Sequence, residues 1–241
     1  MDLEIESLSK ALEMETQRRR ELQAQLDRAN LGFEEFVSTA AHDLRESLRD
    51  VAAFSQLLAE DGAGAGECVD RIRQGAARMQ SLLSDMMDYW TIGTSEGQSS
   101  LTDMEAVLDR ALMLSRPQGA VLTRDPLPCV RGDFHALTRI LHHLIQNAIQ
   151  YCGRPDPRVH VSSERRDLEW VISVRDNGPG IDPAFQERIF GAFKRLHGKE
   201  FPGNGLGLAF CKKAIESQGG HIWVTSTSEA GSTFYFSLPA A

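Results

Sequence analysis

The chain has 241 residues and a formal net charge of −8, with 41% hydrophobic and 25% charged residues. This composition is typical of a soluble globular protein of one or two domains. The negative charge disfavours broad nucleic-acid binding, because the phosphate backbone rewards clustered Lys and Arg. No apolar run approaches the roughly 20 residues of a membrane span, and the acidic N-terminus lacks the apolar core of a signal peptide. The four cysteines form no CxxC pair, so we expect free thiols and a cytoplasmic protein, and the missing cysteine pairs disfavour zinc.

A pattern of alternating three- and four-residue steps runs through the N-terminal segment. Its positions are apolar, at Ile5, Leu8, Leu12, Leu22, Leu26, Ala29, Phe33 and Phe36, except for the polar interruptions Glu15 and Arg19. This period is typical of a left-handed coiled coil, and a stripe this narrow needs a partner helix. The alternative is a lone solvated helix. We expect the helix to continue to about residue 58 and to end at the Gly-rich segment 61–66.

A second helix is predicted by apolar residues at spacings of three and four between Val69 and Trp90. Two helices joined by a short loop form an antiparallel hairpin. Because one hairpin cannot bury both apolar stripes, two chains are expected to pack as a homodimeric four-helix bundle.

The pattern after the polar segment 91–100 is mixed. Helices are expected at 103–115, 133–151 and 204–218, and strands at 158–163, 168–175, 221–226 and 232–238. Segregated helices and mostly antiparallel strands predict an α+β fold with a sandwich of helices on a sheet. The expected order is a coiled-coil helix at 1–32, a dimerisation hairpin at 33–92, a linker at 93–100 and the α+β domain at 101–241.

Four separated segments of the C-terminal half suggest one nucleotide site: 142–151, 176–181, 203–208 and 231–233. Glycines at 203, 205 and 207 let backbone N–H groups approach phosphate, and the helix that follows offers its positive end. Asp176 can accept the exocyclic amine of adenine, and Asn147 offers a neutral oxygen suited to Mg²⁺. Each segment alone is more often a turn or a structural residue, but the four together predict nucleotide binding.

These segments resemble the ATP-binding fold shared by histidine kinases, gyrase-type topoisomerases, MutL-type repair proteins and heat-shock chaperone ATPases, over residues 101–241. The resemblance implies that Asn147 is the Mg²⁺ ligand, that Asp176 recognises adenine and that Tyr151 packs against the base. It further implies an adenine pocket shaped by Gly178 and Gly180, a triphosphate framed by Gly203, Gly205 and Gly207, and Thr233 near Asp176.

The segment 189–199 resembles the Phe box and ATP lid of histidine kinases, phytochrome-like members in particular. This resemblance implies cations near the phosphates, with Lys194, Arg195, His197 and Lys199 as the candidates. The alternative for each of them is a solvated basic loop.

The segment 38–48, with the sequence STAAHDLRESL, resembles the phosphoacceptor box of the same kinases. If Phe36 and Ala40 point inward, His42 points outward, where a neutral imidazole can attack phosphorus. The resemblance points to Asp43 as the residue that orients the ring and takes its proton. Helical spacing, which brings residues i and i+4 together, favours Glu46 instead. We favour Asp43.

Three features depart from the family pattern. Ser47 stands where proline is usual, and Glu46 stands where a Thr or Asn often orients water. On the 133–151 helix, His143 stands where Asn is common, Gln146 where Glu is common and Gln150 where Lys is common.

The expected function is ATP-dependent autophosphorylation of His42 in a two-component system. The phosphoryl group would pass to a response-regulator receiver domain, and input would come from an upstream sensor. One alternative is a degenerate kinase that acts as a dimeric binding module. An ATPase of the gyrase or chaperone class is disfavoured, because Gln146 lacks the carboxylate that activates water in those enzymes.

Overall fold

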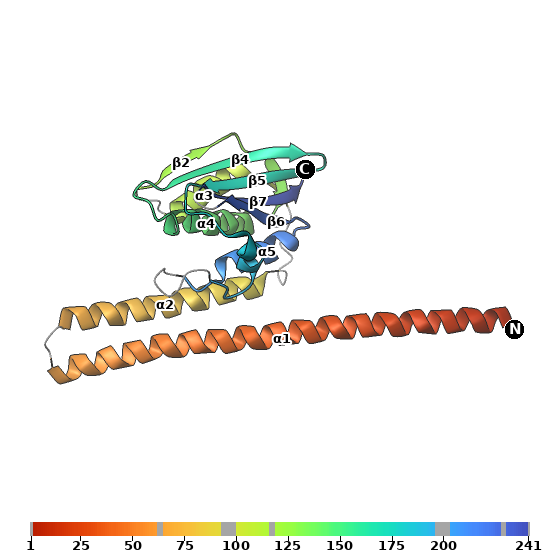
Figure 1. Cartoon of the computed structure of the whole chain (residues 1–241), viewed down its shortest axis with the longest axis horizontal. Coiled ribbons are helices and arrows are strands. Elements are labelled where there is room, and N and C mark those ends of the chain that lie inside the picture. Colours follow the sequence, from red (N-terminus) through yellow and green to blue (C-terminus); the bar gives the residue numbers. More distant parts are fainter. Residues whose placement is uncertain are drawn as a thin grey trace. The chain divides into compact units, whose positions relative to one another are not determined.

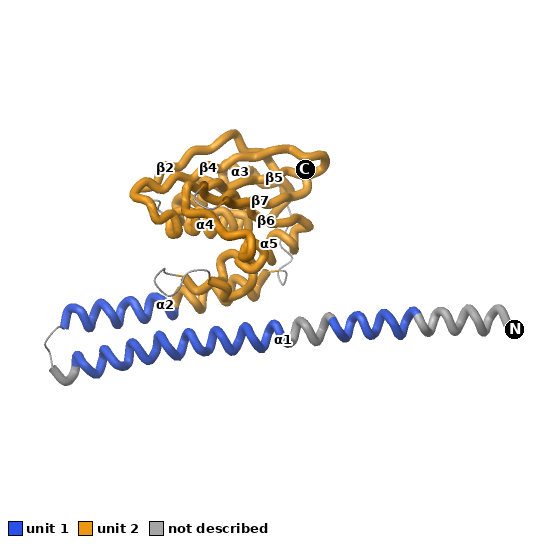
Figure 2. The backbone as a smooth tube through the Cα atoms, in the orientation of Figure 1, with its two compact units in different colours: residues 1–79 blue, residues 80–241 orange. Residues whose placement is uncertain are grey.

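A computed structural model divides the chain into two units, residues 1–79 and 80–241 (Figure 2). It describes the helical backbone from residue 2 to 61 and, with side chains, residues 14–24, 31–58, 65–92, 100–115, 119–195, 203–227 and 230–240.

The first unit consists of α1 (Asp2–Asp61) and the first part of α2 (Ala65–Thr91), shown in Figure 1. The predicted coiled-coil helix and the first hairpin helix are therefore one continuous helix of 60 residues. Helix α1 ends at Asp61 and α2 begins at Ala65, so the break is shorter than the predicted segment 61–66, and its residues 62–64 lie outside the described part. The heptad residues Ile5, Leu8, Leu12, Leu26 and Ala29 also lie outside the described side chains.

The hairpin is held by contacts between α1 and α2 within this unit. Arg78 Nη2 lies 3.0 Å from Asp50 Oδ2. A Cβ atom at Gly75 would lie 2.6 Å from Val51 Cγ2, so this glycine allows a close approach of the two helices. The predicted antiparallel hairpin is confirmed.

The apolar surface of α1 is only partly covered within one chain. Phe36 and Ala40 are buried, with 6% and 2% exposure. Other large apolar side chains of this unit remain exposed, including Leu22, Phe33, Val37, Leu48, Leu57 and Val69. A partner surface would remove this apolar area from water.

The second unit contains the last turns of α2 and an α/β sandwich (Figure 1). Its five-stranded sheet has the order β2-β4-β5-β7-β6, with bounds Val121–Arg124, Arg158–Arg166, Glu169–Asp176, Gly231–Pro239 and Ile222–Thr227. Strand β2 pairs with β4 in parallel, and the other neighbours are antiparallel. The mixed sheet and its helices confirm the predicted fold class.

Three helices cover one face of this sheet: α3 (Met104–Ser115), α4 (Phe134–Gln150) and α5 (Gly207–Glu216) (Figure 1). A second sheet pairs β1 (Ser100–Asp103) with β3 (Cys129–Gly132). Two short 3₁₀ helices, η1 (Pro183–Phe185) and η2 (Arg188–Phe190), follow β5. The helices and the longer strands were predicted, whereas β1, β2 and β3 were not.

Helix α4 is the central element of the core. Asp133 caps its N-terminus by accepting the Ala136 N–H at 2.7 Å, which satisfies one of the free donors of the first turn. Buried residues at helical spacing, such as Leu137, Leu141 and Leu144, then pack against the sheet. This packing fixes which side of α4 can face a ligand.

None of the helices among the described residues is both long enough and apolar enough to cross a bilayer.

Candidate nucleotide site

A cavity of about 450 Å³ lies in the second unit, between α4, the segment after β5, the start of α5 and β7. Of the nucleotide-binding candidates that the structure describes, all but Gly178 and Thr233 line it, namely Asn147, Tyr151, Asp176, Gly180, Lys194, Arg195, Gly203, Gly205 and Gly207. Residues far apart in the sequence thus meet around one space of ligand size.

Asp176 ends β5 at one side of this cavity. Its Oδ1 accepts the N–H groups of Gly178 at 2.8 Å and Ser232 at 3.0 Å. Burial raises the pKa of this carboxyl above its usual 3.8, and the two hydrogen bonds partly oppose that rise. No described residue donates to Oδ2, so this oxygen is available to an N–H donor of a ligand.

The loop after Asp176 depends on two glycines. Gly178 does not line the cavity, but its N–H group fixes the Asp176 carboxylate. Gly180 has φ +82°, and a Cβ there would lie 2.3 Å from the Thr227 carbonyl oxygen. Only glycine fits this left-handed position without moving the end of β6.

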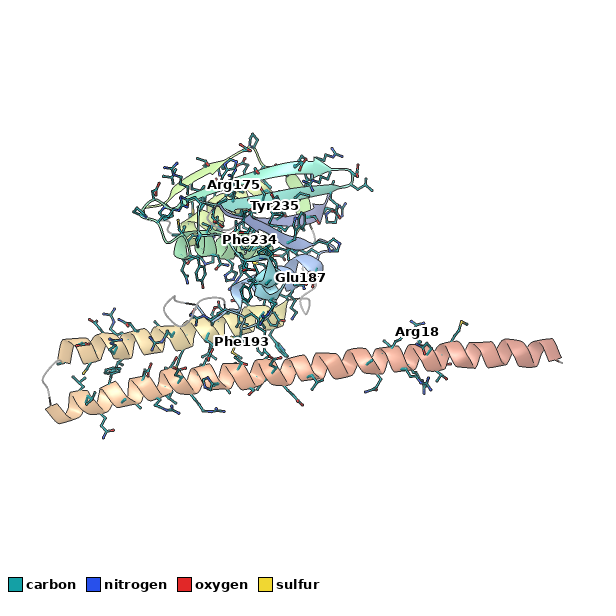
Figure 3. All side chains as sticks on the ribbon, viewed as in Figure 1. Arg18, Arg175, Glu187, Phe193, Phe234 and Tyr235 are labelled. Atoms are coloured by element: carbon teal, nitrogen blue, oxygen red, sulfur yellow. The ribbon has the colours of Figure 1, made fainter. Side chains whose placement is uncertain are left out.

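Thr233 was predicted to lie near Asp176, but its position in β7 differs from that prediction. Side chains alternate between the two faces of a strand, and Ser232 lines the cavity while Thr233 lines a separate groove on the outer face of the sheet. Figure 3 labels the next pair, Phe234 and Tyr235; Phe234 also lines the cavity, and Tyr235 lines the outer groove. The residue of this segment beside Asp176 is therefore Ser232.

The C-terminal half of α4 forms another wall. Gln146, Asn147, Gln150 and Tyr151 line the cavity. Among the described residues the Asn147 amide has no hydrogen-bond partner, so its oxygen can serve a ligand or a cation. Tyr151 caps the helix through its N–H, 3.0 Å from the Asn147 carbonyl oxygen.

His143 also lines the cavity, one turn before Asn147. Its ring lies against Gly207 and 5.4 Å from the Phe210 ring, measured between centroids. Burial, with His142 and Arg139 nearby, lowers the pKa of His143 to about 3. This side chain is therefore neutral at physiological pH and adds no positive charge to the cavity.

The Gly-rich segment before α5 also lines the cavity. Gly205 has φ +75°, and a Cβ there would lie 2.9 Å from the backbone of Phe193 (labelled in Figure 3), whose N–H bonds the Gly205 carbonyl at 2.9 Å. The N–H groups of the first turn of α5 follow this loop directly, and such a helix N-terminus can bind an anion. Lys194 and Arg195 line the same space, whereas His197 and Lys199 lie outside the described residues.

The last turns of α2 contribute cavity residues that the sequence did not single out. Ser81 and Asp85 line it, and Asp85 Oδ2 accepts a hydrogen bond from Asn204 Nδ2 at 2.6 Å. Burial raises the pKa of Asp85, although the Asn204 hydrogen bond opposes the rise. An Asp88–Arg139 ion pair and a 2.8 Å hydrogen bond from Lys213 Nζ to the Tyr89 carbonyl hold α2 against α4 and α5.

The second predicted site, His42, lies in the first unit on α1. Its side chain is 70% exposed, and its Nδ1 lies 3.3 Å from Asp43 Oδ1. The inward positions of Phe36 and Ala40 and the outward position of His42 agree with the predicted orientation. These two helical neighbours at i and i+1 therefore lie within contact distance of each other.

Comparisons with known proteins agree with this geometry. Residues 34–95 match the model of the His Kinase A (phospho-acceptor) domain. Residues 132–241 match that of the histidine kinase-, DNA gyrase B-, and HSP90-like ATPase. The chain therefore belongs to the histidine kinases and carries both their phosphoacceptor and ATP-binding domains.

Among its relatives, phytochromes are prominent. It is 42% identical to Cyanobacterial phytochrome A of Nostoc sp. over 89% of this chain and 29% of that protein. It is 38% identical to the Phytochrome-like protein Cph1 of Synechocystis sp. over 91% of this chain and 31% of that protein. The chain thus spans less than a third of either relative.

Solved structures give the same class. The mycobacterial sensor histidine kinase MprB is 28% identical with a TM-score of 0.51, over 58% of this chain and 97% of that one. The Acinetobacter baumannii histidine kinase AdeS, 21% identical with a TM-score of 0.68, shares the fold over 82% of this chain and 97% of that one.

Proposed function

We propose that this chain is an ATP-dependent histidine autokinase of a two-component system, which phosphorylates His42 and passes the phosphoryl group to an aspartate of a response-regulator receiver domain. One observation carries the proposal. A single chain combines an exposed histidine that lies 3.3 Å from a carboxylate with a cavity that is lined by both a buried carboxylate and a Gly-rich helix N-terminus.

In this proposal the adenine lies at the Asp176 end of the cavity. The free Oδ2 accepts the exocyclic amine of the base, while Gly178 and Gly180 shape the loop around it. Tyr151 packs against the base. The phosphates then extend toward Gly203, Gly205 and Gly207, where backbone N–H groups and the start of α5 favour negative charge.

The cations proposed to act on the phosphates are Lys194, Arg195 and a bound Mg²⁺. The Asn147 amide oxygen fits Mg²⁺, which takes few protein ligands beside phosphate oxygens and waters. When bound, the ion neutralises phosphate charge. The two side chains beside Asn147, Gln146 and Gln150, are neutral, so charge compensation rests more heavily on Lys194 and Arg195.

The phosphoryl acceptor in this proposal is Nε2 of His42. The contact with Asp43 favours the tautomer that carries its proton on Nδ1, which leaves the Nε2 lone pair free. Nε2 forms the new bond to the γ-phosphorus as the bond to the β-phosphate oxygen breaks, and Asp43 takes the Nδ1 proton. Positioning and charge neutralisation supply most of the rate in such a transfer.

The partners follow from the surfaces of the first unit. The exposed apolar side chains of α1 and α2 support a homodimeric four-helix bundle, with residues 1–32 as a coiled-coil signalling helix and 33–92 as the hairpin. Residues 93–100 would link this bundle to the ATP-binding domain at 101–241. An upstream sensor acting through α1 and a cytoplasmic receiver domain complete the proposed pathway.

Incubation with γ-labelled ATP tests the proposal. Label that stays on the protein in base and is lost in acid supports the kinase. Free labelled phosphate alone would favour an ATPase, and the absence of both products would favour a binding module without turnover.

A further inference from the structure

His42 is accompanied by two carboxylates on α1. Asp43 Oδ1 lies 3.3 Å from the histidine Nδ1, and Glu46 follows one helical turn later. One ligand atom of each of the three residues lies within 4.8 Å of the other two. Because the His42 side chain is 70% exposed, ions can reach the group from solvent.

This donor set fits a divalent transition metal. Zn²⁺ binds imidazole nitrogen and carboxylate oxygen at about 2.0–2.2 Å, which places tetrahedral ligand atoms roughly 3.4 Å apart. Residues at i and i+4 share a helix face, so His42 and Glu46 can grip one ion. Small rotations of the partly exposed Asp43 and Glu46 side chains would close the remaining gap. Imidazole also favours Zn²⁺ over the Mg²⁺ that accompanies ATP.

We propose that His42, Asp43 and Glu46 form a binding site for a transition-metal cation such as Zn²⁺, and that the bound ion prevents phosphorylation of His42. The second half rests on the proposed function. A neutral imidazole has one nitrogen lone pair. A metal on either ring nitrogen uses that lone pair and leaves the proton on the other nitrogen, so no nucleophile remains. The same ion engages Asp43, which would otherwise take the ring proton.

Glu46 separates the metal site from the kinase chemistry, because it is a ligand in the first, whereas the proposed function assigns the ring proton to Asp43. The substitution Glu46→Gln removes the charge and weakens one ligand while it preserves the shape. The matched control is Glu34→Gln, the same change at an exposed position of the same helix. Both variants are made in the full chain with Cys68→Ser and Cys129→Ser, since these two thiols are at least partly exposed and would bind zinc themselves.

The first experiment measures Zn²⁺ binding without nucleotide, by calorimetry with buffered free metal. We expect the parent and Glu34→Gln to bind equally. Glu46→Gln should bind at least about tenfold more weakly, since even second-shell changes typically cost that much, and His42→Asn should lose the site. Equal affinity of Glu46→Gln and the parent would overturn the proposal.

The second experiment measures labelling by ATP at fixed free Zn²⁺. The inhibition midpoint should equal the dissociation constant from the first experiment, so that ten times this concentration slows labelling about tenfold by mass action. Relative to its own rate without metal, which should change much less than that of Asp43→Asn, Glu46→Gln should resist inhibition in proportion to its lost affinity. Equal inhibition of all variants, or saturating binding without inhibition, would contradict the metal block. A parent that binds Zn²⁺ but never labels would instead refute the proposed function.

Discussion

Asp176→Asn should weaken nucleotide binding through one defined mismatch. The asparagine oxygen can replace Oδ1 as acceptor of the Gly178 and Ser232 N–H groups, which lie at 2.8 and 3.0 Å, so the loop should keep its shape. The amide nitrogen then takes the place of Oδ2 and points a donor at the adenine amine. Leaving such a buried group unpaired costs about 1–3 kcal/mol, which corresponds to a roughly 5- to 150-fold rise in the dissociation constant.

Calorimetric titration with a non-hydrolysable ATP analogue measures this change, and Asp182→Asn is the control. Asp182 lies on the same loop but caps η1 rather than facing the cavity. Because burial raises the pKa of Asp176, the wild-type affinity should hold above that raised pKa and fall as pH drops through it. Asp176→Asn has no such titration. An unchanged dissociation constant in Asp176→Asn would remove this residue from the adenine site.

Three further predictions concern the kinase core. His42→Ala should abolish labelling by γ-labelled ATP while nucleotide affinity persists, since the residue lies outside the cavity; equal labelling of mutant and wild type would refute the assignment. Asp43→Asn should slow single-turnover phosphorylation at least about tenfold, the lower range of general-base assistance, with unchanged nucleotide affinity. Glu46→Gln should change that rate much less, and a larger loss there would transfer the role to Glu46. Light scattering should find the full chain dimeric at micromolar concentration and residues 101–241 monomeric; a monomeric full chain would contradict the bundle.

The sequence predicted the long elements well because they are periodic. The apolar spacing on α4, from Leu137 to Ile145, and the alternation along β7 extend over several repeats, so each signals its class clearly. Strands β1, β2 and β3 have four residues each, too few to show a period of two. Their pairing is set by tertiary packing that the sequence does not display.

For the site, too, residues in local motifs could be predicted from the sequence, whereas contacts set by tertiary packing could not. Asp176, Asn147 and the glycines stand in local motifs, and the fold brings most of them around one cavity. Ser232 was missed by one position, although the alternation toward buried Phe234 and Phe236 would have placed it on the inner face. Asp85 had no such signal. Its place beside Asn204 joins residues 119 positions apart, and no local pattern predicts that contact.

Helix α1 is continuous from Asp2 to Asp61, so its N-terminal end and His42 belong to the same helix. About 40 residues at 1.5 Å each separate its first turn from His42, a distance of roughly 60 Å. Since Ser47 replaces the usual proline and the helix continues past it to Asp61, neither the lead-in nor the phosphoacceptor segment has a built-in joint. Each residue inserted between the N-terminal end and His42 would turn the imidazole by about 100° relative to that end. The direction in which His42 faces, relative to the N-terminal end of α1, therefore depends on the number of residues between them as well as on the contacts around His42.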